Sequence, residues 1–458
     1  MRNGMTLTRG LVIGLPLVFL WSQQAEAQSN VQLSEPVAIE AAWQQLGDTT
    51  LDRLIEEVLR SNPDVQAAEA RVRGARAAKL SATLDFVPTV TVAGGYTRQR
   101  LSPAQFPGSR NGLVFPDQDV WDAGFDAAWE IDLFGRIRNN VRAQSQFVEA
   151  ANADATDARV TLAAEVARWY FELRGAQEQL AVAVRNGENQ KHTLDLTEQR
   201  LGAGGGTAFD TERARAQWNS TMASIPLLEA RIAGAKYRIG VLVGRPPVQV
   251  AAELESASSL PAPPAARADA PSDSLVLARP DVRAAERALA ASRSLVGAAK
   301  SGWWPTLSVG GSVGYTANAL DHMGDPGTFR YAVGPVISWP FLNLGRVKAH
   351  VDASRAAADE SHDRYTATVL AAEEEVNGAL VRYRSAVARV GRLADAAASS
   401  TKAADLARVR FREGVTDFLQ VLDAERTELD AESQLVQGKT DAATAYAALV
   451  KALGGMKP

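Results

Sequence analysis

The sequence contains no cysteine and only four histidines among its 458 residues. Without cysteine, disulfides, thiolate metal sites, cysteine nucleophiles and lipidation at a cysteine are all excluded. The histidines show no ligand spacing of the HExxH kind; they are His192, His322, His350 and His362. We therefore expect neither a metal site nor a cofactor.

A strong charge of one sign is also missing. The formal net charge is −4, and 22% of the residues are charged. A protein that binds nucleic acid usually carries a clustered positive charge, so we expect no nucleic-acid partner.

Long hydrophobic runs are absent except near the N-terminus. There, Arg2 and Arg9 precede an apolar run over residues 11–20, and the small-residue pattern Ala25-Glu26-Ala27 follows. This order is typical of a secretory signal peptide, which we assign to residues 1–27 with cleavage before Gln28. A membrane anchor would need about 20 apolar residues. The sequence thus predicts an exported protein without a helical membrane span.

One pattern occurs twice along the chain. WEIDLFGR at 129–136 returns 210 residues later as WPFLNLGR at 339–346, and NPDV at 62–65 is matched by RPDV at 279–282. A Pro/Ala-rich stretch at 245–273 separates the halves, and we expect it to be extended rather than helical. An internal duplication of this kind determines the fold class.

The repeat divides the chain into five parts. These are the signal peptide (1–27), an N-terminal periplasmic segment (28–61), repeat 1 (62–245), a linker (246–273) and repeat 2 (274–455). We expect each repeat to contain a helix, then a strand hairpin (86–134 or 303–343), then a helical hairpin (136–245 or 345–455).

Four segments alternate between apolar and polar or small residues, as strands with two unlike faces do. Apolar positions include Val90 and Val92 in the first segment, and Tyr331 to Phe341 in the last. A half-buried sheet of a soluble domain alternates in the same way. The strand length of roughly 10 residues and the aromatic residues near the ends favour a membrane β-barrel.

Four strands cannot close a barrel, because barrels start at about 8 strands. In a bilayer each unpaired backbone group costs several kcal/mol. Several chains must therefore share one barrel, and the pattern alone does not choose between two, three and four chains.

Long helices follow each Gly-Arg pair. Apolar residues recur there at a seven-residue step, which predicts left-handed coiled-coil packing. The helix from Arg136 to about Leu201 would span roughly 100 Å. The repeating positions are Val166, Leu173, Leu180, Gly187, Leu194 and Leu201; Val376, Tyr383, Val390, Ala397, Ala404 and Phe411; and Leu422, Leu429, Val436, Ala443 and Val450.

The duplicated signature marks the predicted junctions between strand and helix. Trp129 and Trp339 suit a membrane interface. Gly135 and Gly345 would let the backbone change direction, and Arg136 and Arg346 would follow as the first residues of the long helices.

Several stretches closely resemble the outer-membrane factors of tripartite efflux systems, the TolC/OprM/NodT type, and the resemblance covers both repeats. They are WEIDLFGR, RPDVRAAERAL (279–289), RFREGVTDFLQVLDAER (410–426), ALVKALGG (448–455) and the N-terminal region at 41–72. The resemblance implies an α+β membrane protein, a homotrimer with a 12-stranded β-barrel in the outer membrane that continues into a 12-helix periplasmic tunnel. Many members of the OprM/NodT branch carry a lipidated cysteine, which this chain lacks.

The resemblance also implies partners and a function. Such ducts contact outer-membrane lipid and receive substrates from an inner-membrane pump through a periplasmic adaptor. The resemblance to the OprM/NodT branch favours the export of drugs or other small amphiphiles as the function. Two alternatives remain: the duct of a type I protein secretion system, and a trimeric coiled-coil surface scaffold. An enzyme is not expected, since the GxSxG match at 310–314 lies within a strand and lacks the strand-turn-helix context of a nucleophile elbow.

Candidate site residues lie near the turns of the helical hairpins. Asp423 aligns with an acidic position that constricts the tunnel in relatives, and Asp210 lies nearby in the first repeat, three residues closer to the turn. An ordinary solvated charge or a helix cap would explain either residue as well. The turns themselves are predicted to dock the adaptor, through Gly204, Gly205, Thr207, Gly414, Val415 and Thr416.

Overall fold

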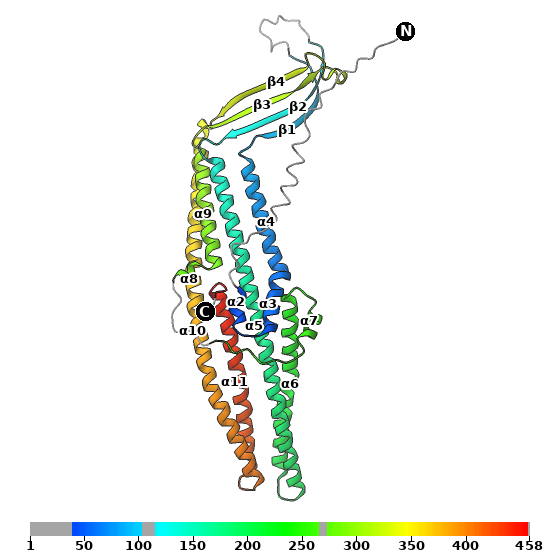
Figure 1. The fold of residues 1–458 in the computed structure, drawn as a ribbon, viewed down its shortest axis with the longest axis vertical. Helices are drawn as coiled ribbons and strands as arrows, with labels where there is room; N and C mark the ends of the chain where they lie inside the picture. Colours follow the sequence, from blue (N-terminus) through cyan, green and yellow to red (C-terminus); the bar gives the residue numbers. More distant parts are fainter. Residues whose placement is uncertain (1–38, 103–114, 265–272, 457–458) are drawn as a thin grey trace, which may run out of the picture. The chain divides into compact units, whose positions relative to one another are not determined.

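The computed structural model describes residues 39–102, 115–264 and 273–456, so the predicted signal peptide lies outside the described residues. The chain divides into two units, residues 1–37 and 38–458, and all described residues belong to the second unit. Figure 1 shows how the helices and strands of this unit are arranged.

The same order of helices and strands occurs twice. The first set is α4 (Pro63–Leu84), β1 (Thr89–Gln99), β2 (Gln118–Ile131), α5 (Arg136–Gly202) and α6 (Ala208–Leu242). The second is α9 (Pro280–Ser301), β3 (Thr306–Ala317), β4 (Phe329–Ser338), α10 (Leu344–Arg412) and α11 (Phe418–Ala452). Shorter helices are α2 (Ile39–Gln44), α3 (Thr49–Ser61), α7 (Pro247–Glu253) and α8 (Asp273–Leu277), with 3-10 turns η2 (Leu320–His322) and η3 (Phe341–Asn343).

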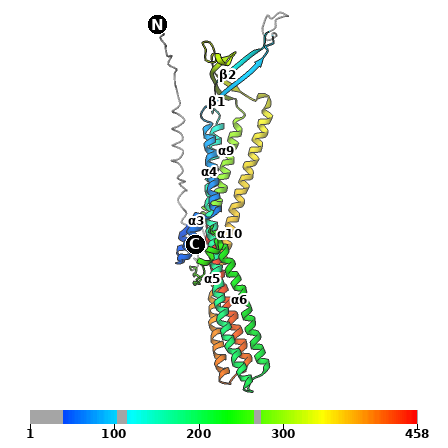
Figure 2. The same ribbon diagram turned by 90° about the vertical axis from the view of Figure 1, so that its right-hand side faces the viewer.

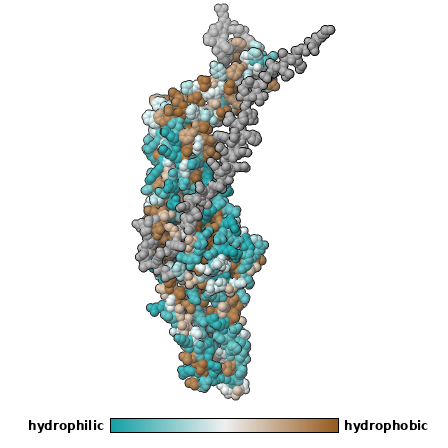
Figure 3. All heavy atoms as spheres, viewed as in Figure 1, coloured by the Kyte–Doolittle hydropathy of each residue, from teal (hydrophilic) through white to brown (hydrophobic). Residues whose placement is uncertain are grey.

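The four strands form one antiparallel sheet in the order β1-β2-β3-β4. Its register places unlike rows of residues on the two faces. One row is Val92, Phe125, Val313 and Tyr331, and the neighbouring row on the other face is Thr91, Asp126, Ser312 and Ala332. The apolar face is uncovered in the single chain, with 77% of Val92 and 74% of Tyr331 exposed. Figure 3 shows hydrophobic residues over the sheet on the face in view.

The long helices form a layer in which neighbours run antiparallel. Helix α5 contacts α6 and α11, and α11 in turn contacts α10, so the order across the layer is α6-α5-α11-α10. Above that, α4 and α9 pack against α5, as Figures 1 and 2 show. Most of the apolar residues predicted to recur at a seven-residue step are buried in these helices. They are Val166, Leu173, Gly187, Leu194, Val376, Tyr383, Ala397, Ala404, Phe411, Val436, Ala443 and Val450.

The N-terminal helices pack beside the trunk at the C-terminal end of α11. The Trp43 ring meets Tyr446 edge-on, with centroids 6.1 Å apart, and the Tyr446 hydroxyl donates to the Ala42 carbonyl at 2.8 Å. Asp48 caps α3 and also accepts a hydrogen bond from the Tyr170 hydroxyl at 2.6 Å. Burial raises the pKa of Tyr170 and Tyr446 to about 12. These contacts fasten the N-terminal helices to α5 and α11.

The stretch after α6 crosses the helix layer as a belt, residues 254–264. Arg174 of α5 donates to the Ser256 carbonyl at 2.8 Å, and the Leu260 amide donates to Glu178 at 3.0 Å. The Tyr383 hydroxyl of α10 donates to the Pro264 carbonyl. The belt therefore connects both helical hairpins.

The expectation that residues 245–273 are entirely extended was wrong. Pro247 to Glu253 form the short helix α7, with Pro247 in its first turn. Proline is well suited to this position, because its missing N–H would be unpaired there and its fixed φ suits a helix. Val250 of α7 is buried.

The second junction also differs from the prediction. Strand β4 ends at Ser338, so Trp339 and Phe341 lie outside it. Pro340 comes directly after Trp339, and proline has no N–H that could donate a further backbone hydrogen bond within the sheet. Gly345 lies inside α10 and not at a change of direction, whereas Gly135 precedes α5 with a φ of 83°, as predicted.

Within the described residues, none of the helices combines the length and the apolarity that crossing a bilayer requires.

The crossing of α5 and α11 yields a stability prediction. A Cβ added at Gly175 would lie 2.1 Å from the Thr440 Oγ1 atom and 3.0 Å from its Cβ. Gly175→Ala should therefore destabilise the fold by about 1–3 kcal/mol, as overpacking does, and lower the thermal midpoint followed by circular dichroism. Gly187→Ala is the matched control, since it meets only the flexible Met222 side chain at 3.1 Å. An equal loss in both variants would contradict the packing argument.

Candidate functional site: the hairpin tips and the seam above them

The two hairpin turns have the same backbone. Gly204 and Gly414 have φ values of 76° and 73°, a region that glycine adopts without strain. In each turn the next amide reaches back to the helix end: Gly205 donates to the Arg200 carbonyl, and Val415 to the Arg410 carbonyl, both at 2.9 Å. Gly205 itself is not in the positive region. The tips are thus two Schellman-type helix ends.

Each returning helix begins with a side-chain cap. Thr207 Oγ1 accepts from the Asp210 amide at 3.2 Å and donates to the Asp210 carboxylate at 2.7 Å. In the second hairpin Asp417 accepts from the Gln420 amide at 3.1 Å, and Thr416 bonds to the Gln420 side chain. Thr207 is thus the cap residue of α6, and Asp210 lies in the first turn with its carboxylate bonded to the Thr207 hydroxyl.

Asp423 lies on the exposed side of α11, whereas Asp210 lies in the first turn of α6, where Thr207 engages its carboxylate. Within residues 39–102, 115–264 and 273–456, no cation pairs with the Asp423 carboxylate. Its counterpart 210 residues earlier is Arg213, whose guanidinium lies 5.5 Å from the centre of the Phe209 ring. A carboxylate ring at this level would come from α11 alone.

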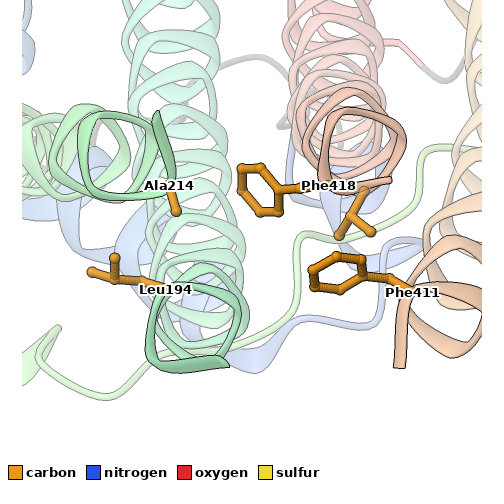
Figure 4. Close-up of a cluster of buried hydrophobic side chains, with 5 residues drawn as sticks. Leu194, Ala214, Phe411 and Phe418 are labelled. Atoms are coloured by element: carbon orange, nitrogen blue, oxygen red, sulfur yellow. The ribbon is translucent and has the colours of Figure 1, made fainter. Parts of the chain in front are cut away.

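An apolar cluster and one arginine hold the two tips of the chain together. Leu194, Ala214, Phe411, Phe418 and Val421 come from four helices and are all buried; Figure 4 shows them between the ribbons. Arg200 Nη2 donates to the Phe411 carbonyl at 2.7 Å, and its guanidinium lies 4.0 Å from the centre of the Phe411 ring. The C-terminal end of α10 is thereby capped by a cation from α5.

Above the tips, the seam between α5 and α11 becomes polar. Thr193 donates to Glu425 at 2.7 Å, and Asn186 donates to Glu432 at 2.8 Å. Arg408 of α10 pairs with Glu425 at 3.0 Å and with Glu428 at 2.6 Å. Sequence reasoning missed these residues; the spacing of Glu425, Glu428 and Glu432 on one face of α11 was the available signal.

Burial raises the pKa of Glu428, and Arg408 opposes that shift. The nearby Glu432 and Asp405 carboxylates add to the rise. In contrast, the pKa of Arg408 is raised by its hydrogen bonds to Glu425 and Glu428, against the effect of burial. The seam therefore holds carboxylates in a partly dry environment where their charge is costly.

The junction residues connect the strands to the helices. The Trp129 indole donates to the Phe86 carbonyl at 2.9 Å, and the Trp339 indole to the Trp303 carbonyl at 3.2 Å. Asp132 accepts from the amides of Ile137 and Arg138 and so caps α5. Arg136 pairs with Glu130 at 2.8 Å, whereas Arg346 is an exposed residue of α10. Among the described residues, no three acidic or histidine side chains gather closely enough to hold a metal ion.

An amphipathic strand sheet joined to two long helical hairpins is the architecture of an outer-membrane channel with a helical trunk. The model of the outer membrane efflux protein family matches residues 54–245 and 272–455. The chain belongs to the outer membrane efflux protein family.

Individual relatives agree with that assignment. The chain is 29% identical to the pyoverdine export outer membrane protein OpmQ of Pseudomonas aeruginosa, over 90% of this chain and 86% of OpmQ. It is 27% identical to the toluene efflux pump outer membrane protein TtgF of Pseudomonas putida, over 91% and 85% of the two chains. The solved outer-membrane channel OprN is 37% identical, with a TM-score of 0.83 and 91% and 92% of the chains covered.

The buried carboxylate predicts a pH dependence. Because the folded-state pKa of Glu428 is raised above 4.5, its contribution to stability is fully present below pH 4.5 and is lost as the pH rises through the raised pKa. Glu428→Gln keeps an acceptor for Arg408 without the charge. The melting temperature of the wild type relative to this variant should therefore fall as the pH rises through that window. If the melting temperature of the wild type rises relative to that of the variant as the pH rises, the raised pKa of Glu428 is contradicted.

Proposed function

We propose that three copies of the chain form the exit duct of a tripartite efflux pump. The observation that carries this proposal is the four-stranded sheet with one uncovered apolar face and two free edges, joined to two long helical hairpins in the same chain. Free edges in a bilayer cost several kcal/mol per unpaired group. Three copies would close a 12-stranded barrel in the outer membrane, and their hairpins would form a trunk in the periplasm.

The proposed cargo is a class of small amphiphilic molecules, drugs among them. Support comes from two relatives, the pyoverdine export protein OpmQ and the toluene efflux pump protein TtgF. Both favour small-molecule export over a type I protein secretion duct. The proposed partners are a periplasmic adaptor and an inner-membrane pump, with residues 1–27 as the signal that directs export.

The adaptor is proposed to dock on the tips, because a hairpin turn is the part of the trunk that faces along its axis. Val415 is 66% exposed, and its counterpart Gly205 has open space beside its backbone, with the nearest atom to an added Cβ at 3.9 Å. Neither residue packs into the cluster around Phe411 and Phe418. Bulk can therefore be added at both positions without breaking a helix cap.

The double variant Gly205→Trp/Val415→Trp tests the docking surface. We expect it to assemble and reach the outer membrane as wild type does, but to lose adaptor crosslinking and leave cells drug-sensitive. The double alanine variant at the same positions is the control and should export normally. Normal drug resistance in cells that carry both tryptophans would show that the tips are only turns.

Asp423 is proposed as the gate residue, with Asp210 kept as a weaker candidate because its carboxylate is engaged by Thr207. Three Asp423 carboxylates around a narrow opening would repel one another and attract cations.

Asp423→Ala should therefore raise single-channel conductance in planar bilayers and weaken block by divalent cations. Asp430→Ala, seven residues further along the same exposed side of α11, is the control and should leave both unchanged. If the wild type and Asp423→Ala have equal conductance and equal cation block, the proposed gate role of Asp423 is wrong.

A further inference from the structure

Four charged residues lie on the polar face of the described strands. Three are carboxylates of β2, and they share a face because they are four residues apart: Asp122, Asp126 and Glu130. The fourth is Arg330 of β4, whose guanidinium lies against the Asp122 carboxylate. In the proposed barrel this face lines the lumen, because the opposite face of the sheet is apolar.

The Arg330 side chain crosses β3 to reach β2. Its Nη2 atom donates to Asp122 at 2.6 Å, and its Nε atom donates to the same carboxylate at 2.9 Å. The Thr316 hydroxyl of β3 also donates to Asp122, at 2.6 Å. Gly124 and Gly314 are opposite each other on β2 and β3, and neither has a side chain that would block this path. The charge of Asp122 is therefore matched by an arginine that holds both of its oxygens.

Glu130 is matched in the same way, whereas Asp126 is not. The Arg136 guanidinium donates to the two Glu130 oxygens through Nε and Nη2, at 2.8 Å each. Asp126 lies midway between these two pairs, is exposed, and forms no ion pair with any described residue. Its neighbours across the sheet are small and uncharged: Thr91, Ser312 and Ala332. Of the three carboxylates, Asp126 alone presents an unmatched charge among the described residues.

We propose that Asp126 sets the ion selectivity of the barrel lumen, and that Arg330 keeps Asp122 from contributing to it. The inference rests on the proposed duct, in which three copies would place three Asp126 carboxylates in one ring. Rings of Asp or Glu make a pore selective for cations, because they concentrate counter-ions in the lumen. The barrel then passes cations and cationic amphiphiles more readily than anions of the same size. This ring is separate from the proposed gate residue Asp423, which belongs to α11.

The strength of this selectivity depends on salt. The screening length is about 10 Å at 0.1 M ionic strength and about 3 Å at 1 M. An unmatched carboxylate therefore acts on passing ions in dilute salt and hardly at all in concentrated salt. The pair of Asp122 and Arg330 acts weakly in both, because its opposite charges are in contact at 2.6 Å and cancel over longer distances.

Reversal potentials in planar bilayers test the proposal, since under a KCl gradient they give the ratio of K⁺ to Cl⁻ permeability. All channels carry Asp423→Ala, so that the proposed gate adds no charge. Asp126→Asn should lower the ratio by about a factor of two near 0.1 M salt and leave it unchanged near 1 M. Arg330→Gln should raise the ratio in dilute salt, because it removes a cation and leaves the Asp122 charge unmatched.

The matched control is the double variant Asp122→Asn/Arg330→Gln. It removes both members of the ion pair and leaves the net charge of the lumen unchanged, so it should keep the ratio of the parent channel. Asp122→Asn alone leaves Arg330 unmatched and should lower the ratio. Opposite responses to the loss of Asp122 and the loss of Arg330 separate an effect of charge from a general disturbance of the sheet, which would move both variants alike.

The failure of this inference differs from the failure of the proposed duct. Channels with equal ratios in the parent and Asp126→Asn near 0.1 M salt would overturn the role of Asp126 and leave the duct intact. Equal shifts in Arg330→Gln and in the double control would overturn the role of Arg330. A parent protein that is monomeric in detergent and forms no channels would overturn the duct, and this inference with it.

Discussion

The antiparallel packing of α5 against α11 joins the two halves of the chain, and the other parts of the described structure depend on it. Close approach is allowed by Gly175, which leaves room for Thr440 at the crossing. The N-terminal helices pack on this pair through Tyr170 and Tyr446, and the belt at 254–264 is bonded to α5 through Arg174. The packing of α9 against α5, the belt at 254–264 and the bond from Arg200 to Phe411 link the same two halves at other levels.

The chemistry of that contact changes along its length. Beside the N-terminal helices it is aromatic and apolar, and toward the tips it contains Asn186, Thr193, Glu425 and Arg408. A buried ion pair contributes little net stability, because the desolvation cost offsets much of the attraction. Its removal from one side only is costly, since the other charge stays buried. We therefore expect the lower seam to add little net stability, although the loss of Arg408 alone would be costly.

Much of the fold follows from local pattern. The period of two in the strands and the step of seven in the helices are short-range signals, and they predicted the four strands and the long hairpins. The failures have local causes as well. Pro340 ends β4 early, so that α10 begins at Leu344 and Gly345 falls inside the helix. Pro247, read as a sign of extended chain, begins a helix instead.

The candidate site was harder to predict, because its bonds cross between helices. The contact between Asp210 and the cap residue Thr207 could be weighed from their spacing, because they lie three residues apart. By contrast, nothing in the order of residues shows that Arg408 reaches Glu425 and Glu428. Such contacts depend on which faces of α10 and α11 meet, and a seven-residue step gives that only for the apolar positions.

The comparison of the two tips shows which features the backbone requires and which it does not. The caps differ in residue type, Thr207 against Asp417, yet a side-chain oxygen of each accepts from the amide three residues later, so the cap requires such an oxygen and not one residue type. Arg200 and Arg410 are the same residue at corresponding positions, although the turn needs no arginine. Within the described chain a side-chain bond is seen for the Arg200 guanidinium, which donates to the Phe411 carbonyl. The turn geometry therefore does not explain why position 410 holds an arginine.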